Sequence, residues 1–195
     1  ASITALRGLT LTQANAFNTN LVSVETLTIS NALDQVGASF DLGYLDGVNR
    51  VNLGAGLATA GQTLAGLPNG STIDTVADLT QVLTASVTGA AASSADSLTV
   101  VLSGAANIDY TSIAVADVET LTIDVTETTA SAANTRAATL GIASTATATA
   151  AGGSGAAQTV NIIGTESLTI DTAIAADTIN ASGMSARLTT TAGLT

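Results

Sequence analysis

The side chains of this sequence that could carry out chemistry, above all cation binding, are its carboxylates. The chain has 15 acidic residues against 4 basic ones, with a net charge of −11. It contains no histidine, cysteine or lysine. The commonest general base, the thiolate nucleophile and the usual partners of a serine nucleophile are therefore missing. The sequence predicts that the chain is not an enzyme.

The acidic excess favours divalent cations, above all calcium, which takes about 6–8 oxygen ligands. Asp41 and Asp46 lie in a glycine-containing stretch that ends in Asn49, and Asp171 and Asp177 border a predicted turn. These four aspartates are the predicted Ca²⁺ ligands. Each is also explained as a turn residue whose carboxylate bonds to its own backbone, or as solvated surface charge. Both alternatives stay open at this point.

Three glutamates, Glu25, Glu119 and Glu166, hold the same place at the head of a repeated phrase. One interpretation is a metal ligand or a contact between subunits, used once in each repeat. The favoured interpretation is a charge that protects a strand edge from stray pairing.

The phrase itself occurs three times, at residues 24–30, 118–124 and 165–171. In each copy apolar and polar residues alternate, as in Leu27 and Ile29 against Thr26 and Thr28. A period of two predicts a strand with one buried face. The threonine face can form ladders with threonines of neighbouring strands.

The spacing of such kernels predicts the fold class. Successive kernels are about 19 to 25 residues apart, a period typical of stacked repeat units. The prediction is an all-β protein, a β-solenoid-like stack of repeats, with a β-sandwich as the alternative. Residues 1–195 are predicted to form one continuous unit of a longer chain, with a less regular segment over residues 1–20. The central apolar residues of the kernels are Leu27, Val51, Ile73, Leu98, Leu121, Leu140, Val160 and Ile179.

Composition narrows the function further. Apolar residues make up 46% of the chain but aromatic residues only 2%, which predicts a thin core of small branched side chains. Four scattered arginines are a poor footprint for phosphates, so nucleic-acid binding is not expected. No run reaches the ~18 apolar residues that cross a bilayer, so membrane insertion is not expected either.

Three features together resemble one protein family. They are the repeated Val-Glu-Thr-Leu-Thr-Ile phrase, the run of residues 91–100 and the stretch of residues 178–189. They are similar to RTX-type, type I-secreted bacterial surface-layer (S-layer) proteins and related adhesins or matrix proteins. The resemblance implies calcium-dependent β-solenoid or β-sandwich segments that build a lattice outside the outer membrane. The glycine–aspartate nonapeptides that hold the family's calcium do not occur here, so no ligand residue carries over.

The resulting expectation is a secreted structural protein at the cell surface or in the extracellular matrix. It assembles with copies of itself into an S-layer lattice or fibre, with calcium bridging acidic loops and cell-surface polysaccharide as a further candidate partner. The alternative is an adhesin or binding module of a type I-secreted protein. The scarcity of aromatic residues argues against a sugar-binding platform.

Overall fold

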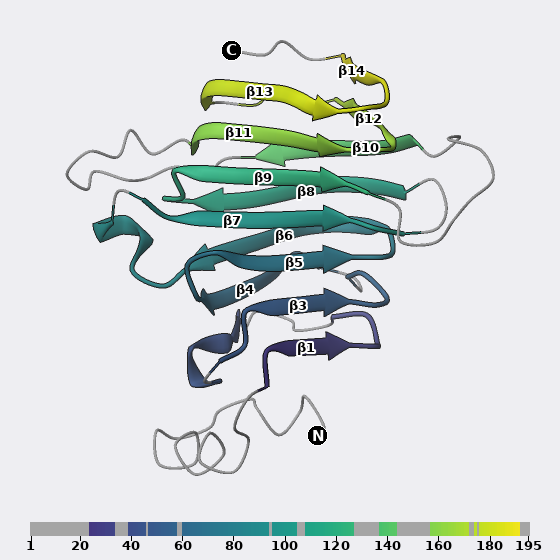
Figure 1. The fold of residues 1–195 in the computed structure, drawn as a ribbon. Coiled ribbons are helices and arrows are strands. Elements are labelled where there is room, and N and C mark those ends of the chain that lie inside the picture. Colours follow the sequence, from purple (N-terminus) through teal and green to yellow (C-terminus); the bar gives the residue numbers. More distant parts are fainter. Residues whose placement is uncertain are drawn as a thin grey trace.

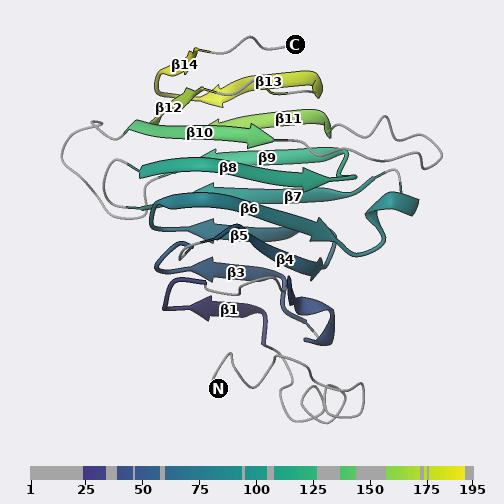
Figure 2. The ribbon, with the colours of Figure 1, turned by 180° about the vertical axis from the view of Figure 1, so that it is seen from behind.

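Two parallel β-sheets lie face to face and rise together from the N-terminal to the C-terminal end of the molecule (Figures 1 and 2). The computed structural model describes residues 24–33, 39–45, 47–57, 60–93, 95–104, 108–126, 137–143, 157–171, 174 and 176–191. The chain passes from one sheet to the other and back, so that consecutive strands alternate between the sheets. Strands of the two sheets run in opposite directions (Figure 1).

Each sheet has seven strands. The first sheet, in spatial order, contains β1 (Thr26–Ile29), β3 (Arg50–Leu53), β5 (Ser71–Thr75), β7 (Ser97–Leu102), β9 (Thr120–Val125), β11 (Ala157–Gly164) and β13 (Ala176–Met184). The second contains β2 (Ser39–Asp41), β4 (Gln62–Leu67), β6 (Leu79–Val87), β8 (Ile108–Ala116), β10 (Ala137–Ala143), β12 (Ser167–Ile170) and β14 (Leu188–Thr190). Two short 3₁₀ helices, η2 (Leu42–Tyr44) and η3 (Ala90–Ala92), follow β2 and β6.

Every strand pair within the described residues is parallel. A sandwich built from hairpins would pair its strands antiparallel. The β-solenoid prediction is therefore confirmed, and the sandwich alternative is wrong. Here one coil means one strand of each sheet together with its connections.

The predicted kernels map onto this architecture with one exception. Seven of the eight central residues lie on the seven strands of the first sheet, while Leu140 lies on β10 of the second. The repeated phrase divides in the same way, because its first two copies form β1 and β9 and the third forms β12. Identical alternation thus serves both sheets, since each sheet buries one face against the other.

The core is a set of apolar columns that run along the stack between the sheets. In the first sheet Val51 pairs with Ile73, and Ile73 pairs with Val100, in parallel register. All three residues are fully buried, at 0% exposure. Buried residues of the second sheet, such as Leu64 and Ile113, face them to complete a thin core of aliphatic side chains.

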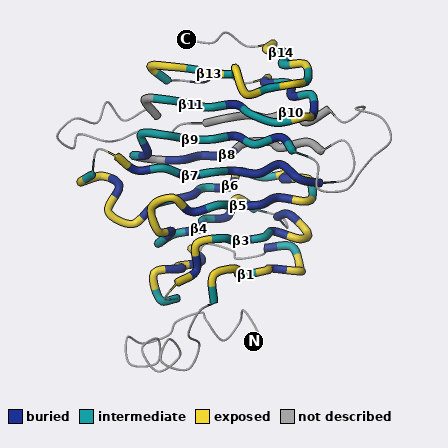
Figure 3. Tube along the Cα trace, viewed as in Figure 1, coloured by how far each residue is buried: buried dark blue, intermediate teal, exposed yellow. Residues whose placement is uncertain are grey.

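Burial falls off at both ends of the stack (Figure 3). Leu27 on β1 is only partly buried, whereas its register partner Val51 is fully buried. At the other end, the apolar residues of β13 and β14 are likewise only partly buried. The described coils therefore expose apolar core surface at the first and last strands.

A tight turn joins β4 to β5. Pro68 and Gly70 lie in a tight turn in which the Ser71 backbone N–H donates to the Pro68 carbonyl oxygen at 3.2 Å. The predicted irregular segment at residues 1–20 lies outside the described residues.

Candidate cation ligands and interaction surfaces

Asp41 is the first predicted Ca²⁺ ligand, and its carboxylate is used within its own turn. It ends β2 and precedes η2, and its Oδ1 accepts a hydrogen bond from the Gly43 backbone N–H at 2.8 Å. This is the bond that an aspartate makes when it initiates a turn. The structure thus gives Asp41 a conformational role. Its predicted partner Asp46 lies outside the described residues.

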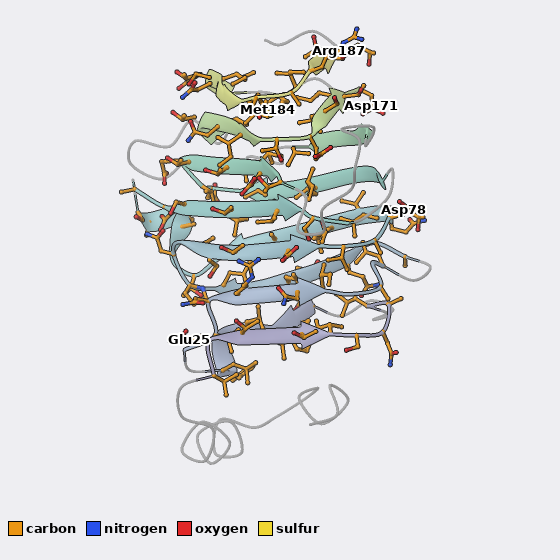
Figure 4. All side chains as sticks on the ribbon, turned by 45° about the vertical axis from the view of Figure 1, so that its right-hand side comes forward. Glu25, Asp78, Asp171, Met184 and Arg187 are labelled. Carbon is orange, nitrogen blue, oxygen red and sulfur yellow. The ribbon has the colours of Figure 1, made fainter. Side chains whose placement is uncertain are left out.

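Asp171 and Asp177 border the connection from β12 to β13, as predicted, but belong to different sheets. Asp171 directly follows β12 of the second sheet, and Asp177 is the second residue of β13 in the first. Both are exposed, and Figure 4 shows Asp171 beside the upper strands of the stack. Among the residues that the structure describes, no three acidic side chains form a group that could hold a metal ion. Calcium binding stays a prediction.

The three recurrent glutamates have three different environments. Glu25 is exposed at the N-terminal end of the stack (Figure 4). Glu119 is partly buried, and its Oε2 accepts a hydrogen bond from the Asp96 backbone N–H at 2.7 Å. Glu166 is 3% exposed. A single role for all three is therefore not supported, because only their sequence context is shared.

A polar ladder precedes the strands of the first sheet, and sequence analysis did not identify it. The Asn69 side-chain oxygen accepts from the Ser97 backbone N–H at 2.9 Å, and its amide donates to the Ala95 carbonyl oxygen at 3.2 Å. Glu119 holds the Asp96 N–H from the opposite side. The entry to β7 is thus fixed by side chains from the coils before and after it. We call Asn69, Asp96 and Glu119 the polar ladder.

Buried carboxylate oxygens near the strand entries lack hydrogen-bond partners. They are Oδ2 of Asp96, Oδ1 of Asp117 and Oε2 of Glu166. Asp96 is only 3% exposed, so its charge is removed from water. An unpaired buried polar group costs about 1–3 kcal/mol, and a charged group costs more.

Arg50 and Asp74 form an ion pair between neighbouring coils, which the spacing of charges alone did not predict. Arg50 Nη2 lies 2.6 Å from Asp74 Oδ2. The other carboxylate oxygen of Asp74 accepts a hydrogen bond from the Ser103 hydroxyl group. The signal was present in the sequence only as a separation of 24 residues, close to one coil.

The outer face of the first sheet carries a column of polar side chains that is mainly threonine and asparagine, in line with the predicted threonine ladder. Along this column Asn180 donates to the Asn161 side-chain oxygen at 3.3 Å. A neighbouring column contains a second contact, in which the Asn52 amide lies 3.5 Å from the Thr28 hydroxyl oxygen. The first column consists of Thr26, Arg50, Thr72, Thr99, Thr122, Asn161 and Asn180.

Comparisons with known proteins add no relative to this picture. The chain matches no family model, no curated protein and no solved structure. A search of the described residues for an apolar helix of membrane-spanning length finds none.

Proposed function

We propose that this chain is a structural segment that assembles with copies of itself at the cell surface or in the extracellular matrix, as an S-layer lattice or fibre. The observation that carries the proposal is the in-register stack of parallel strands, with a thin aliphatic core and a polar outer column. A solenoid gains length and strength coil by coil, because each coil packs on its neighbours.

The surface chemistry supports a structural role. The outer column of the first sheet is mainly threonine and asparagine, which pair from coil to coil rather than converge on a cleft. The acidic excess supports calcium as a bridge between acidic loops of neighbouring molecules. The resemblance to type I-secreted surface-layer proteins points the same way, including export from the cell.

Electron microscopy of the purified chain, with calcium and then with a chelator, tests the proposal. We expect ordered sheets or filaments that dissolve when calcium is removed. Order that survives the chelator keeps the structural role and removes calcium as the link. Discrete particles in both conditions contradict self-assembly and favour the alternative, an adhesin or binding module that recognises a surface glycan.

A further inference from the structure

The turn between β4 and β5 contains a dipeptide that can react with itself. Asn69 is followed by Gly70, and no other asparagine of the chain precedes a glycine. In such a dipeptide the backbone nitrogen of the glycine can attack the side-chain amide carbon of the asparagine, because glycine has no Cβ to hinder the approach. The attack closes a succinimide ring and releases ammonia. Water then opens the ring, and the asparagine becomes aspartate or isoaspartate.

The backbone of the turn keeps the two reacting atoms apart. The Ser71 backbone N–H donates to the Pro68 carbonyl oxygen at 3.2 Å, and the Ser71 hydroxyl group donates to the same oxygen at 2.6 Å. Gly70 has a φ of +79°, whereas Asp117 is the one described non-glycine residue with a positive φ, so Asn69 has a negative φ. This combination defines a type II turn, in which ψ of the second residue is about +120°. Ring closure needs a ψ of the opposite sign, because the glycine nitrogen must lie on the same side as Cβ.

The neighbouring coil also engages both reacting groups. β5 and β7 lie side by side in the first sheet (Figure 1). The Gly70 backbone N–H donates to the Ser97 carbonyl oxygen at 2.9 Å, a bond that stabilises the proton which the nitrogen must lose. Asn69 Oδ1 accepts from the Ser97 backbone N–H at 2.9 Å and from its hydroxyl group at 3.2 Å, and Nδ2 donates to the Ala95 carbonyl oxygen at 3.2 Å. The amide can therefore turn toward the Gly70 nitrogen only after these bonds break.

The product of the reaction does not fit the same contacts. An ionised aspartate accepts hydrogen bonds and donates none, so it cannot replace the bond from Asn69 Nδ2 to the Ala95 carbonyl oxygen. Its charge would lie beside Asp96, a buried carboxylate between the two residues that Asn69 contacts. Like charges on neighbouring strands destabilise a sheet. Isoaspartate adds a methylene group to the main chain, which changes the spacing of the turn.

We propose that Asn69 is a self-modification site that the intact stack keeps unreactive. When β5 and β7 separate at this turn, the Gly70 nitrogen forms a bond with Asn69 Cγ. The bond from Cγ to Nδ2 breaks, and ammonia leaves with the proton of the Gly70 nitrogen. One water molecule then opens the ring. Because the product cannot restore the contacts between β5 and β7, a transient local opening becomes permanent.

Peptide mass spectrometry tests the reactivity of Asn69. The chain is incubated at mildly alkaline pH, in buffer and in guanidinium chloride, and is then digested with pepsin in acid, which stops the reaction. In the denaturant we expect position 69 to show the mass gain of an exchange of NH₂ for OH before any other asparagine. In buffer we expect this reaction to be at least about a hundredfold slower, because only molecules with an open turn react.

Asn69→Gln is the control for the assignment, because ring closure through the longer side chain is slow. We expect no mass gain at position 69 of this variant over the same period. Equal rates for the wild type in buffer and in denaturant would show that the fold does not protect Asn69. A rate in denaturant no faster than that of the other asparagines would show that the dipeptide has no special reactivity. Either result overturns the inference.

Refolding after incubation tests whether the change is permanent. The wild type and Asn69→Gln are kept in guanidinium chloride until position 69 of the wild type has reacted, and both are then diluted into buffer. We expect the wild type to regain weaker protection from hydrogen exchange at β5 and β7 than a sample unfolded only briefly. Asn69→Gln should regain the protection of its own briefly unfolded sample. Full recovery of the reacted wild type would contradict a permanent change.

A variant that carries the product residue from the start makes the test independent of refolding. Asn69→Asp should exchange faster at β5 and β7 than the wild type, without any incubation. Gln81→Glu, on β6 of the second sheet, makes the same change from amide to carboxylate and should leave β5 and β7 protected as in the wild type. Equal effects of the two variants, or no effect of Asn69→Asp, would overturn the role assigned to the Asn69 amide.

Discussion

Asp74 on β5 links three consecutive coils, with Arg50 on β3 as its charged partner at 2.6 Å. On the other side it accepts a hydrogen bond from Ser103, which follows β7. The Asp74 side chain is 11% exposed, whereas that of Arg50 is 39% exposed. Parallel in-register stacking makes this bridge possible, because it brings residues one coil apart to adjacent strands.

We expect Asp74→Ala to lower the free energy of unfolding by roughly 2–3 kcal/mol. The substitution removes a charge-assisted bond on each side of a largely buried carboxylate, and such bonds contribute about 1.5–3 kcal/mol. Urea unfolding followed by circular dichroism measures the change. Asp177→Ala is the matched control on exposed surface, and its effect should stay within about 0.5 kcal/mol. Equal effects of the two substitutions would show that the bridge adds no stability.

The solenoid was predictable from the sequence for two reasons. The strand kernels recur at intervals close to one coil, and apolar and polar residues alternate within each kernel. Leu27 and Val51, chosen from this pattern, pair directly in the structure. Leu140 was assigned to the same series but lies in the opposite sheet. Both sheets are buried on one face only, so alternation shows which residues point inward and leaves the sheet undetermined.

The contacts of the candidate site residues could not be predicted, because the sequence does not show which residues of neighbouring strands lie side by side. The step from Leu121 to its partner Val160 is much longer than that from Leu27 to Val51, so side-chain neighbours cannot be counted along the chain. The pairing of Arg50 with Asp74 depends on such neighbours. For Asp41 the alternative interpretation as a turn residue was correct. Its hydrogen bond lies within its own turn, so predicting it did not require knowledge of the strand register.

Gly164 on β11 should not tolerate a side chain. Its φ is +133°, and a Cβ there would lie against the backbone of Val125, including its nitrogen at 2.8 Å. We expect Gly164→Ala to destabilise the fold by about 3 kcal/mol or more, from backbone strain and overpacking together. Gly89 also has a positive φ, of +78°, but a Cβ there meets nothing within 4 Å. Gly89→Ala should therefore cost only about 1 kcal/mol. Comparable urea midpoints for the two variants would contradict the steric argument.

The polar ladder predicts opposite effects for its two acids in the absence of calcium. Asp96→Asn removes a charge from a buried carboxylate whose Oδ2 has no partner, so we expect stability to stay equal or to rise by about 1 kcal/mol. Glu119→Ala removes the acceptor of the Asp96 N–H and should cost about 1–2 kcal/mol. Thermal unfolding in chelator measures both changes. A marked loss of stability in Asp96→Asn under these conditions would show that its carboxylate has a stabilising partner.

The Asp96→Asn variant also tests calcium binding independently of assembly. If the ladder holds a cation, added calcium raises the melting temperature of the wild type, and Asp96→Asn abolishes that rise. Asp78→Asn, at an exposed acid directly before β6, is the control and should keep the calcium response of the wild type.

The loss of stability caused by truncating an apolar side chain should depend on its position in the stack. Ile123 on β9 is 0% exposed, so Ile123→Ala should cost about 3–4 kcal/mol through lost burial and a cavity. Its neighbour Thr122 points outward, and Thr122→Ala should cost well under 1 kcal/mol. Leu27→Ala on β1 removes a side chain that is only partly buried, and its cost should fall between these values.

Hydrogen exchange shows which strands each substitution destabilises. Each coil contacts mainly its neighbours, so a weakened end can open without the middle. In Leu27→Ala we expect faster exchange at β1 and β3, with β9 protected as in the wild type. In Ile123→Ala protection should fall on both sides of β9, because the substitution weakens the stack at its centre. Uniform loss of protection in Leu27→Ala would show instead that all coils unfold as one cooperative unit.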